Sequence, residues 1–296
     1  MGACGSRSGQ VTTSKLAASQ ALSTLGPNSK PSSAVVPPGQ CVFTEEWSPA
    51  TLVAKEMTGK SSRVFTFALP DATKPLGLST CACILAKGGL DASGSAVVRP
   101  YTPISTNSMI GKFELLIKIY PEGLMSQHID RLSIGDTMDF KHIPFNVKVQ
   151  YPYKKKAVGM ICGGTGVTPM IQALHALLGT PEDKTHVSML YGSRVNDDIL
   201  AEELLNRWAD ASGGRFTCTH VLSQDPEVAS AWRGFKGRIS RELIQEHMPP
   251  PSEDCSIFVC GPPGFYDTLC GPRNEPNELT GLLKEMGYTA AQVVKF

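Results

Sequence analysis

Hydrophobic and polar positions follow two different periods along the chain, and the period changes near residue 150. Before that point, apolar and polar side chains alternate in short runs that Gly, Pro, Ser and Asp clusters separate. These runs cover residues 50–57, 63–70, 81–88, 113–120 and 136–142. Regular short strands with turn signals between them predict a small antiparallel β-barrel. One short stretch with helical spacing, residues 124–132, interrupts the strands.

After the linker at residues 151–156, apolar strands alternate with segments of helical spacing. The expected strands are residues 157–164, 186–193, 216–223 and 256–263, and the expected helices are residues 168–179, 198–210, 241–248 and 278–287. Alternating strands and helices predict a doubly wound parallel sheet with helices on both faces. The predicted fold class is therefore an antiparallel barrel followed by an α/β domain.

The first 39 residues consist mainly of Ser, Thr, Ala, Gly and Pro and contain no acidic side chain. This composition predicts a disordered tail. The expected organisation is a tail at residues 1–39, a barrel domain at 40–150 and an α/β domain at 151–296.

Composition narrows the range of partners. A net charge of +1 over 296 residues provides no general field for nucleic acid, so we expect no nucleic-acid partner. No apolar run approaches the roughly 18 residues of a membrane-spanning helix. The nine cysteines include no Cys-x-x-Cys pair, which argues against a disulfide framework, an iron–sulfur cluster or a metal site.

The N-terminus, MGACGS, fits the pattern for N-myristoylation at Gly2, with Ser6 at the required spacing, and Cys4 could carry a second acyl chain. Two chains would hold the protein at the cytoplasmic face of a membrane. The alternative is a mitochondrial transit peptide, because Arg7 and Lys15 lie in a Ser-rich stretch without acidic residues. An inert tail is the third interpretation.

Three glycines end the first strand of the α/β domain, at Gly163, Gly164 and Gly166 around Thr165. In a doubly wound sheet, ligands bind beyond the carboxyl ends of the strands. Missing side chains would let a pyrophosphate reach backbone N–H groups at the start of the next helix. The spacing matches neither the common dinucleotide fingerprint nor a P-loop, and a tight strand-to-helix turn would also explain it.

Two further motifs flank this loop in the sequence. RPYTP, at residues 99–103, combines an Arg fork suited to phosphate, a Tyr ring that can pack on a flat cofactor, and a Thr hydroxyl that can bond a ring heteroatom. CGPPGF, at residues 260–265, ends the last expected strand in a rigid, narrow turn. Alone, each motif could belong to an ordinary strand or turn.

Together with KIYPEGLMSQHI at residues 118–129 and the C-terminal segment 282–296, these motifs resemble the ferredoxin-reductase-type flavoproteins, and within them the NADH-cytochrome b5 reductase family. The resemblance runs from about residue 40 to the last residue. It implies an FAD-binding barrel and an NADH-binding α/β domain, with FAD and NADH as cofactors.

For FAD, the resemblance implies that Arg99 holds the pyrophosphate, that Tyr101 packs on the flavin, and that Thr102 bonds near its reactive nitrogen. Other residues would line the FAD site: Pro100, Leu116, Lys118, Tyr120, Gly123, Met125 and Ser126. Leu124 stands where the family usually has Lys, which removes one positive charge from the phosphate contacts.

For NADH, the resemblance implies that the loop from Gly163 to Gly166 receives the phosphates and that Cys260 lies beside the nicotinamide. From the same domain, Thr168 would touch the flavin and Phe296 would cover the flavin face. Gly261, Pro262 and Pro263 would also bind a cofactor. The implied catalytic residues are Thr102, Lys118 and Cys260.

Asp198 follows the second strand of the α/β domain, where an acidic residue accepts a hydrogen bond from the adenosine ribose and disfavours a 2′-phosphate. It therefore favours NADH over NADPH, whereas Arg194 argues mildly the other way. In the alternative interpretation, Asp197 and Asp198 only cap the following helix.

The family's chemistry is hydride transfer from NADH to FAD, followed by single-electron transfer to cytochrome b5 or a similar haem protein. Alternatives are a flavin reductase of another acceptor, such as a quinone, a hydroxy-acid dehydrogenase without flavin, and a nucleotide-binding module without redox activity. Lys154, Lys155 and Lys156 could steer an acidic partner or could simply be solvated. A monomer is favoured, although no feature determines the oligomeric state.

Overall fold

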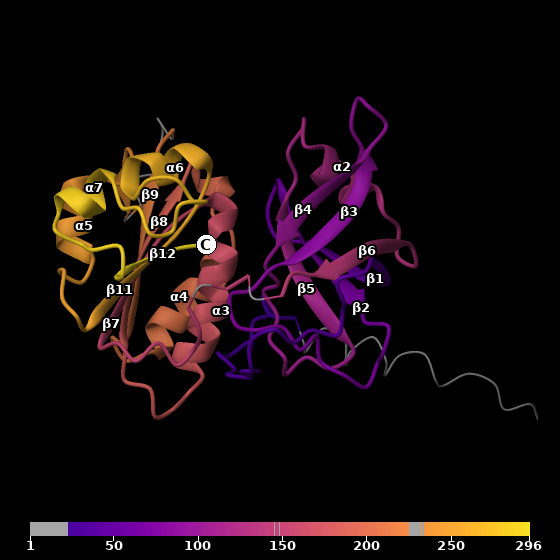
Figure 1. Cartoon of the computed structure of the whole chain (residues 1–296), viewed down its shortest axis with the longest axis horizontal. Helices are drawn as coiled ribbons and strands as arrows, with labels where there is room; N and C mark the ends of the chain where they lie inside the picture. Colours follow the sequence, from indigo (N-terminus) through magenta and orange to yellow (C-terminus); the bar gives the residue numbers. More distant parts are fainter. Residues whose placement is uncertain (1–22, 145, 148, 225–231, 233) are drawn as a thin grey trace, which may run out of the picture.

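The structure is a computed structural model that describes residues 23–144, 146–147, 149–224, 232 and 234–296. Two sheets lie side by side in it, an antiparallel one on the right of Figure 1 and a parallel one on the left. The elements of the first sheet span 48–142 and those of the second span 157–295, within the ranges that the change of hydrophobic period predicts.

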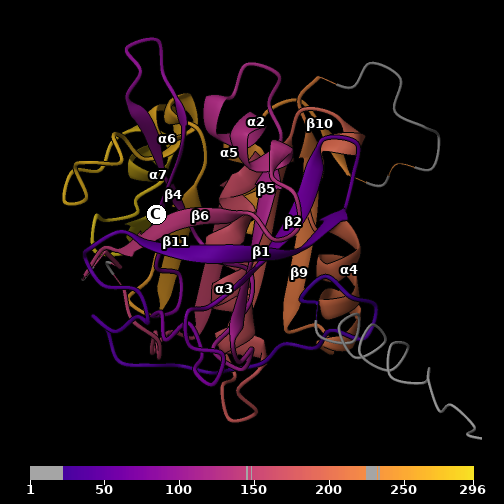
Figure 2. The same cartoon turned by 90° about the vertical axis from the view of Figure 1, so that its right-hand side faces the viewer.

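The first sheet is antiparallel throughout, with strand order β4-β3-β6-β1-β2-β5. Its strands are β1 (Ser48–Met57), β2 (Ser62–Ala68), β3 (Ile84–Leu90), β4 (Ala96–Tyr101), β5 (Lys112–Lys118) and β6 (Thr137–His142), and the helix α2 (Leu124–Arg131) lies between β5 and β6. The sheet curls around an apolar core (Figures 1 and 2). The predicted antiparallel barrel is confirmed.

Four phenylalanine rings fill this core. Phe43, Phe67, Phe113 and Phe140 are each almost fully buried, and the centroids of their contacting rings are 5.0–5.8 Å apart. Most of these contacts are edge-to-face, the geometry that ring quadrupoles prefer. Phe67 and Phe113 come from the neighbouring strands β2 and β5, and Phe140 comes from β6, which β1 separates from β2. The cluster therefore joins strands that do not all pair directly.

The second sheet is parallel throughout, with strand order β10-β9-β8-β7-β11-β12. Its strands are β7 (Ala157–Gly163), β8 (His186–Ser193), β9 (Phe216–Leu222), β10 (Phe235–Lys236), β11 (Cys255–Cys260) and β12 (Val293–Lys295). Its helices are α3 (Val167–Leu178), α4 (Glu202–Ala211), α5 (Arg241–His247), α6 (Pro263–Leu269) and α7 (Gly281–Glu285), with short 3-10 turns η1 (Gly164–Gly166) and η2 (Asn196–Asp198).

Helices cover both faces of the parallel sheet, as the sequence predicts. The helices α3 and α4 pack on the face toward the antiparallel sheet, and α5, α6 and α7 pack on the opposite face (Figure 1). The chain passes from β7 to β8 on one side and later places β11 on the other side of β7. The carboxyl ends of β7 and β11 therefore meet at a topological switch point, where α/β sheets bind ligands.

The two sheets share one apolar core along α3. Met170, Ile171 and Leu174 of α3 belong to the same buried cluster as Val64 of β2 and Leu116 of β5. A continuous apolar contact of this kind disfavours free rotation of the two domains, because separation would expose it to water.

Residues 23–39 differ from the expected disordered tail, because they lie along both domains. The amide of Thr24 donates to the buried carboxylate of Glu114 on β5, over 2.8 Å. Further along, the indole of Trp208 on α4 donates to the carbonyl of Ser29, and the amide of Ser32 donates to His175 Nδ1 on α3. The indigo segment beside α3 and α4 in Figures 1 and 2 shows this path. Composition does not reveal these contacts, because backbone groups make most of them.

Glu114 provides a test of this packing. Burial raises the pKa of its carboxyl above the ordinary 4.5, and the Thr24 contact offsets part of the shift. Because the folded state holds the Glu114 proton more tightly, protonation of Glu114 contributes to the free energy of unfolding in full below pH 4.5. This contribution is lost as the pH rises through the folded-state pKa. Glu114→Gln removes that loss, so urea unfolding should show the variant gaining stability relative to the wild type from pH 4 to pH 7. A stability difference that does not change with pH would contradict the assignment.

Candidate active site

A cleft of about 1630 Å³ runs between the two sheets. Single-ligand pockets usually measure about 300–1,000 Å³, so this cleft has room for more than one cofactor. Every residue that the sequence assigns to a site lines it: Arg99, Pro100, Tyr101, Thr102, Leu116, Lys118, Tyr120, Gly123, Met125, Ser126, Gly163, Gly164, Thr165, Gly166, Thr168, Asp198, Cys260, Gly261, Pro262, Pro263 and Phe296. Segments far apart in the chain therefore meet at one place.

The glycine loop after β7 serves two different purposes. A Cβ on Gly166 would lie 2.1 Å from the carbonyl oxygen of Cys260, so this glycine lets the loop approach the end of β11. Gly164 has a positive φ of 54° and nothing within 4 Å of a Cβ position, so the loop is open there. Gly166 thus fits the tight-turn interpretation, and Gly164 leaves room for a ligand.

The RPYTP segment forms the end of edge strand β4. Arg99 is exposed and donates to its own chain at the Val98 carbonyl, and no acidic side chain in the described residues pairs with it. Tyr101 packs partly against the barrel core, and burial raises the pKa of its hydroxyl to about 12, so it remains protonated. The segment thus presents an unneutralised cation and a neutral phenol at the cleft.

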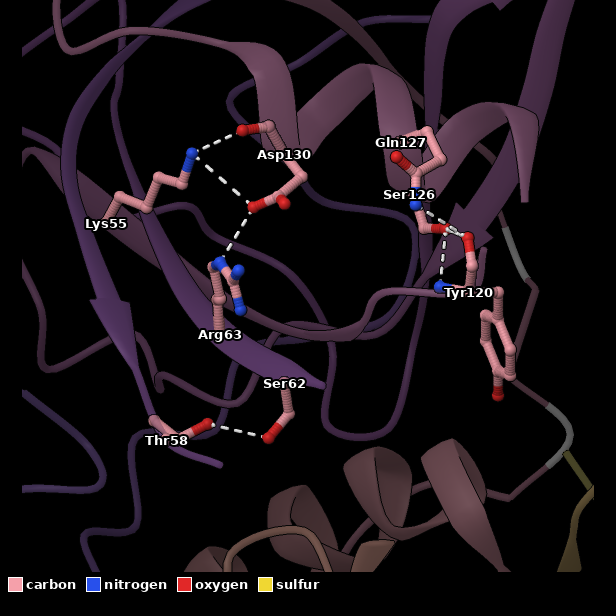
Figure 3. Close-up of polar contacts among 8 residues, drawn as sticks. All are labelled: Lys55, Thr58, Ser62, Arg63, Tyr120, Ser126, Gln127 and Asp130. Carbon is pink, nitrogen blue, oxygen red and sulfur yellow. Dashed lines mark hydrogen bonds and ion pairs between the residues drawn. The ribbon is translucent and has the colours of Figure 1, made fainter. Parts of the chain in front are cut away.

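The start of α2 reaches the same cleft. The Ser126 hydroxyl accepts from the amide of Tyr120 over 3.1 Å (Figure 3). It also donates to the carbonyl of Gly123 over 3.1 Å. The resemblance implies that the Ser126 hydroxyl and the amides at this helix start meet phosphate. Here the Ser126 hydroxyl shapes the turn before α2, which leaves the first amides of the helix as the donors for that phosphate. Leu124 is half exposed beside them and adds no charge.

The other end of α2 is fixed to the barrel by charge. Arg63 Nε of β2 lies 2.7 Å from the Asp130 carboxylate, and Lys55 Nζ of β1 lies 3.4 Å from it (Figure 3). These side chains are largely buried, so the pair is less screened than a surface one. Anchoring α2 at Asp130 positions its first turn at the cleft.

Lys118 and Asp198 join the two domains across the cleft. Lys118 Nζ on β5 lies 2.5 Å from Asp198 Oδ1 on η2, and both side chains are almost buried. Asp198 Oδ2 is buried and accepts no hydrogen bond from the described residues, although Arg194 Nε lies 3.5 Å away. The helix α4 begins only at Glu202, so the prediction of a helix start at residue 198 and the capping interpretation of Asp198 are wrong.

Cys260 and the last residue, Phe296, lie at adjacent strand ends. The strands β11 and β12 pair in parallel, the Phe296 amide donates to the Val259 carbonyl, and the Tyr266 hydroxyl donates to the Phe296 carbonyl. Burial raises the pKa of the Cys260 thiol to about 11, so it is protonated at neutral pH. The thiol is therefore suited to packing against a ligand and not to nucleophilic attack.

Sequence reasoning missed several residues that line the cleft, among them Asn146, Ser193, Ser223, Arg238 and Tyr266. Asn146 bonds the backbone of Cys83 in both directions, through its carbonyl oxygen and its amide nitrogen. Ser193 ends β8 and Ser223 directly follows β9, which are neighbouring parallel strands. This position at the strand ends is the only feature of the sequence that could have indicated them. Nothing in the sequence indicates Asn146.

The residues present fit two dinucleotides. Arg99, exposed and without an acidic partner in the described chain, suits a pyrophosphate on the barrel side of the cleft. Gly164 and the start of α3 suit a second pyrophosphate, and Asp198 Oδ2, which accepts no hydrogen bond from the described residues, suits a ribose hydroxyl. The geometry thus divides the cleft into two halves, one from each domain.

The chain matches two family models, the oxidoreductase FAD-binding domain over residues 49–144 and the oxidoreductase NAD-binding domain over residues 160–271. The first range covers the antiparallel sheet except Ser48, and the second covers most of the parallel sheet, without the start of β7 and without β12. The chain is therefore a flavoprotein oxidoreductase with an FAD-binding domain followed by an NAD-binding domain.

Similar proteins narrow this class. The chain is 36% identical over 255 residues to NADH-cytochrome b5 reductase 2 of Meyerozyma guilliermondii, covering 85% of each chain, and 37% identical over 266 residues to the Aspergillus terreus protein of that name, covering 86% of this chain and 81% of the other. The cytochrome b5 reductase domain of Ulva prolifera nitrate reductase superimposes with a TM-score of 0.76, at 25% identity, covering 87% of this chain and 100% of that domain. The chain belongs to the NADH-cytochrome b5 reductase family.

The ion pair across the cleft can be tested by a double-mutant cycle. Lys118→Met leaves a buried carboxylate with only the more distant Arg194, so we expect a loss of about 3 kcal/mol in the free energy of unfolding. Adding Asp198→Asn should recover part of that loss, because no unpaired charge then remains. Denaturant unfolding of the single and double variants measures the coupling.

Lys156→Met is the matched control, because its ion pair with Asp254 is exposed and should contribute little. Strict additivity of Lys118→Met and Asp198→Asn would show that the two side chains do not interact in solution.

Proposed function

We propose that this protein oxidises NADH and passes the electrons, through FAD, one at a time to cytochrome b5. The observation that carries the proposal is a single cleft in which an FAD-binding and an NAD-binding domain meet, in a chain of the NADH-cytochrome b5 reductase family. The names of the relatives state cytochrome b5 as their electron acceptor. The proposal extends this acceptor to the present chain.

The chain's own residues supply binding and alignment. A bound flavin accepts a hydride and releases electrons singly. Arg99 would neutralise its pyrophosphate, Tyr101 would pack on the ring, and Thr102 would bond near the reactive nitrogen. On the facing domain, Cys260 would lie beside the nicotinamide, and Thr168 would touch the flavin. Asp198 accepts a ribose hydroxyl, so NADH is favoured over NADPH.

The electron acceptor approaches the cleft and not the linker lysines. Lys155 and Lys156 bond the Glu253 carbonyl and the Asp254 carboxylate, next to the amino ends of β7 and β11. The cleft lies at the carboxyl ends of these strands, at the opposite edge of the sheet. Lysine steering of a haem partner at residues 154–156 is therefore not part of the proposal.

The proposal is tested with purified full-length protein. A yellow preparation with flavin absorbance should be bleached by NADH without oxygen, and it should then reduce purified cytochrome b5. A quinone is the comparison acceptor, because preferential reduction of the quinone would replace cytochrome b5 in the proposal. A colourless protein that still binds NADH would favour a nucleotide-binding module or a dehydrogenase without flavin.

Arg99 provides a residue-level test. Arg99→Ala removes the exposed cation beside the proposed pyrophosphate, so FAD affinity should fall by roughly tenfold or more. Flavin retained after gel filtration and FAD titration of the flavin-free protein measure the effect. Lys112→Ala on β5 is a control outside the cleft that should retain flavin normally. Full retention by Arg99→Ala would remove Arg99 from the site.

We also propose that the protein is held at the cytoplasmic face of a membrane by acyl chains on Gly2 and Cys4, where a membrane-bound partner would be locally concentrated. These residues lie outside the described part of the chain, and the support is the MGACGS pattern alone. Within the described part, no helix combines the length and apolarity needed to cross a bilayer.

Gly2→Ala tests the membrane proposal. We expect the wild-type protein to sediment with membranes from its native cell and the variant to remain in the supernatant, because one acyl chain or none binds only weakly. Intact-mass analysis should find a myristoyl group on Gly2. A mature chain that begins well downstream of Gly2 would instead support import into mitochondria.

A further inference from the structure

Gln172 on α3 makes the most direct polar link between the two domains at the base of the cleft. Its side-chain amide nitrogen donates to two carbonyl oxygens of the barrel domain, Pro103 O over 2.7 Å and Ser105 O over 2.6 Å. The side chain is buried, so these bonds do not compete with water. Both amide hydrogens are therefore committed to the other domain.

The two carbonyls belong to a segment that is itself fixed to β5. The amide of Ile104, between them, donates to the Glu114 carbonyl over 2.9 Å, and the amide of Glu114 donates to the Ser105 hydroxyl over 2.9 Å. Gln172 thus contacts a backbone that cannot shift without also breaking two bonds to β5.

Both ends of this link lead into the cleft. On the barrel side, Pro103 directly follows Thr102, and β5 continues from Glu114 to Leu116 and Lys118, which line the cleft. On the other side, Gln172 lies one helical turn after Thr168, which also lines it. One amide therefore connects the segment proposed to hold the flavin with the start of α3, where the NADH-binding domain is proposed to touch the flavin.

In the competing interpretation, Gln172 is simply a buried side chain whose hydrogen bonds are all made, and its role is purely structural. Other contacts also join the domains here, including the Cys81 thiol, which donates to the Pro169 carbonyl, and the shared apolar core along α3. Apolar contacts and a single weak thiol bond allow small sliding motions. Two short bonds from one planar amide fix direction as well as distance.

We propose that Gln172 is a positioning residue for hydride transfer, which sets the separation of the nicotinamide and flavin rings by fixing α3 to the Pro103–Ser105 backbone. The proposal rests on the proposed function. Gln172 itself does not line the cleft, so it acts through the positions of Thr102 and Thr168 and not by contact with a cofactor.

Gln172→Met tests the proposal, because it keeps the side-chain length and removes both donors. Asn107→Leu is the matched control: the Asn107 amide also donates to two carbonyls, those of Ala34 and Leu78, but Asn107 does not line the cleft. Gln172→Asn is a milder second variant, which retains the amide one methylene too short to make both bonds.

The first measurement is flavin reduction in single turnover. In Gln172→Met the limiting rate at saturating NADH should fall about tenfold or more, because ångström-scale misplacement of reacting groups has effects of this size. Flavin content and NADH affinity should stay within about twofold of the wild type. Gln172→Asn should be slowed less, and Asn107→Leu should reduce its flavin at the normal rate.

The second measurement is hydrogen exchange in the flavin-free protein, which does not depend on catalysis. Exchange should accelerate at Ile104 and at the start of α3 in Gln172→Met, but not at the start of α3 in Asn107→Leu. A normal limiting rate in Gln172→Met, or equal slowing in Asn107→Leu, would overturn the positioning role. If Gln172→Met does not fold, a normal rate in Gln172→Asn has the same meaning.

Failure of the proposed function is distinguishable from failure of this inference. A wild-type protein that NADH does not reduce would contradict the function. Unchanged exchange at the start of α3 in Gln172→Met would contradict the link between the domains, whatever reaction the protein catalyses.

Discussion

The contact of α3 with β5 and the segment beside it is the constraint on which the site depends. The helix α3 covers one face of the parallel sheet and also packs against the antiparallel sheet. Met170 and Leu174 do so with apolar surface that joins Leu116 of the barrel in one buried cluster. Because that cluster closes the base of the cleft, the cofactor-binding edges of both domains face each other across a space of defined width.

Polar contacts at two further places also fix the orientation of the two domains relative to each other. Lys118 and Asp198 pair across the cleft, and residues 23–39 bond both domains at a distance from it. An ion pair that is almost buried contributes little net stability compared with apolar residues of the same size, but it tolerates few alternative geometries. These contacts therefore determine how the two domains are arranged more than they increase the free energy of unfolding.

Two glycines in the loop after β7, Gly164 and Gly166, have different roles although they are only two residues apart. Gly166 is required because the Cys260 carbonyl occupies the position that a side chain would need, whereas Gly164 has a left-handed conformation with open space beside it. The close approach at Gly166 packs the loop after β7 against the end of β11. The open space beside Gly164 lies two residues before that contact.

Hydrophobic periodicity predicted five of the six strands of the antiparallel sheet, four of the six strands of the parallel sheet and four of the five helices that cover it, because each depends on local spacing. It missed the strands β4, β10 and β12 and the helix α6. The motifs also identified many of the residues that line the cleft, because the residues of each motif are close together in the sequence, but they missed others such as Asn146 and Arg238. The pairing of Lys118 with Asp198, the contacts of Gln172 and the path of residues 23–39 were decided only by tertiary structure. Each of these joins groups that lie far apart in the chain, often through backbone carbonyls or amides, which every residue possesses and no sequence pattern can distinguish.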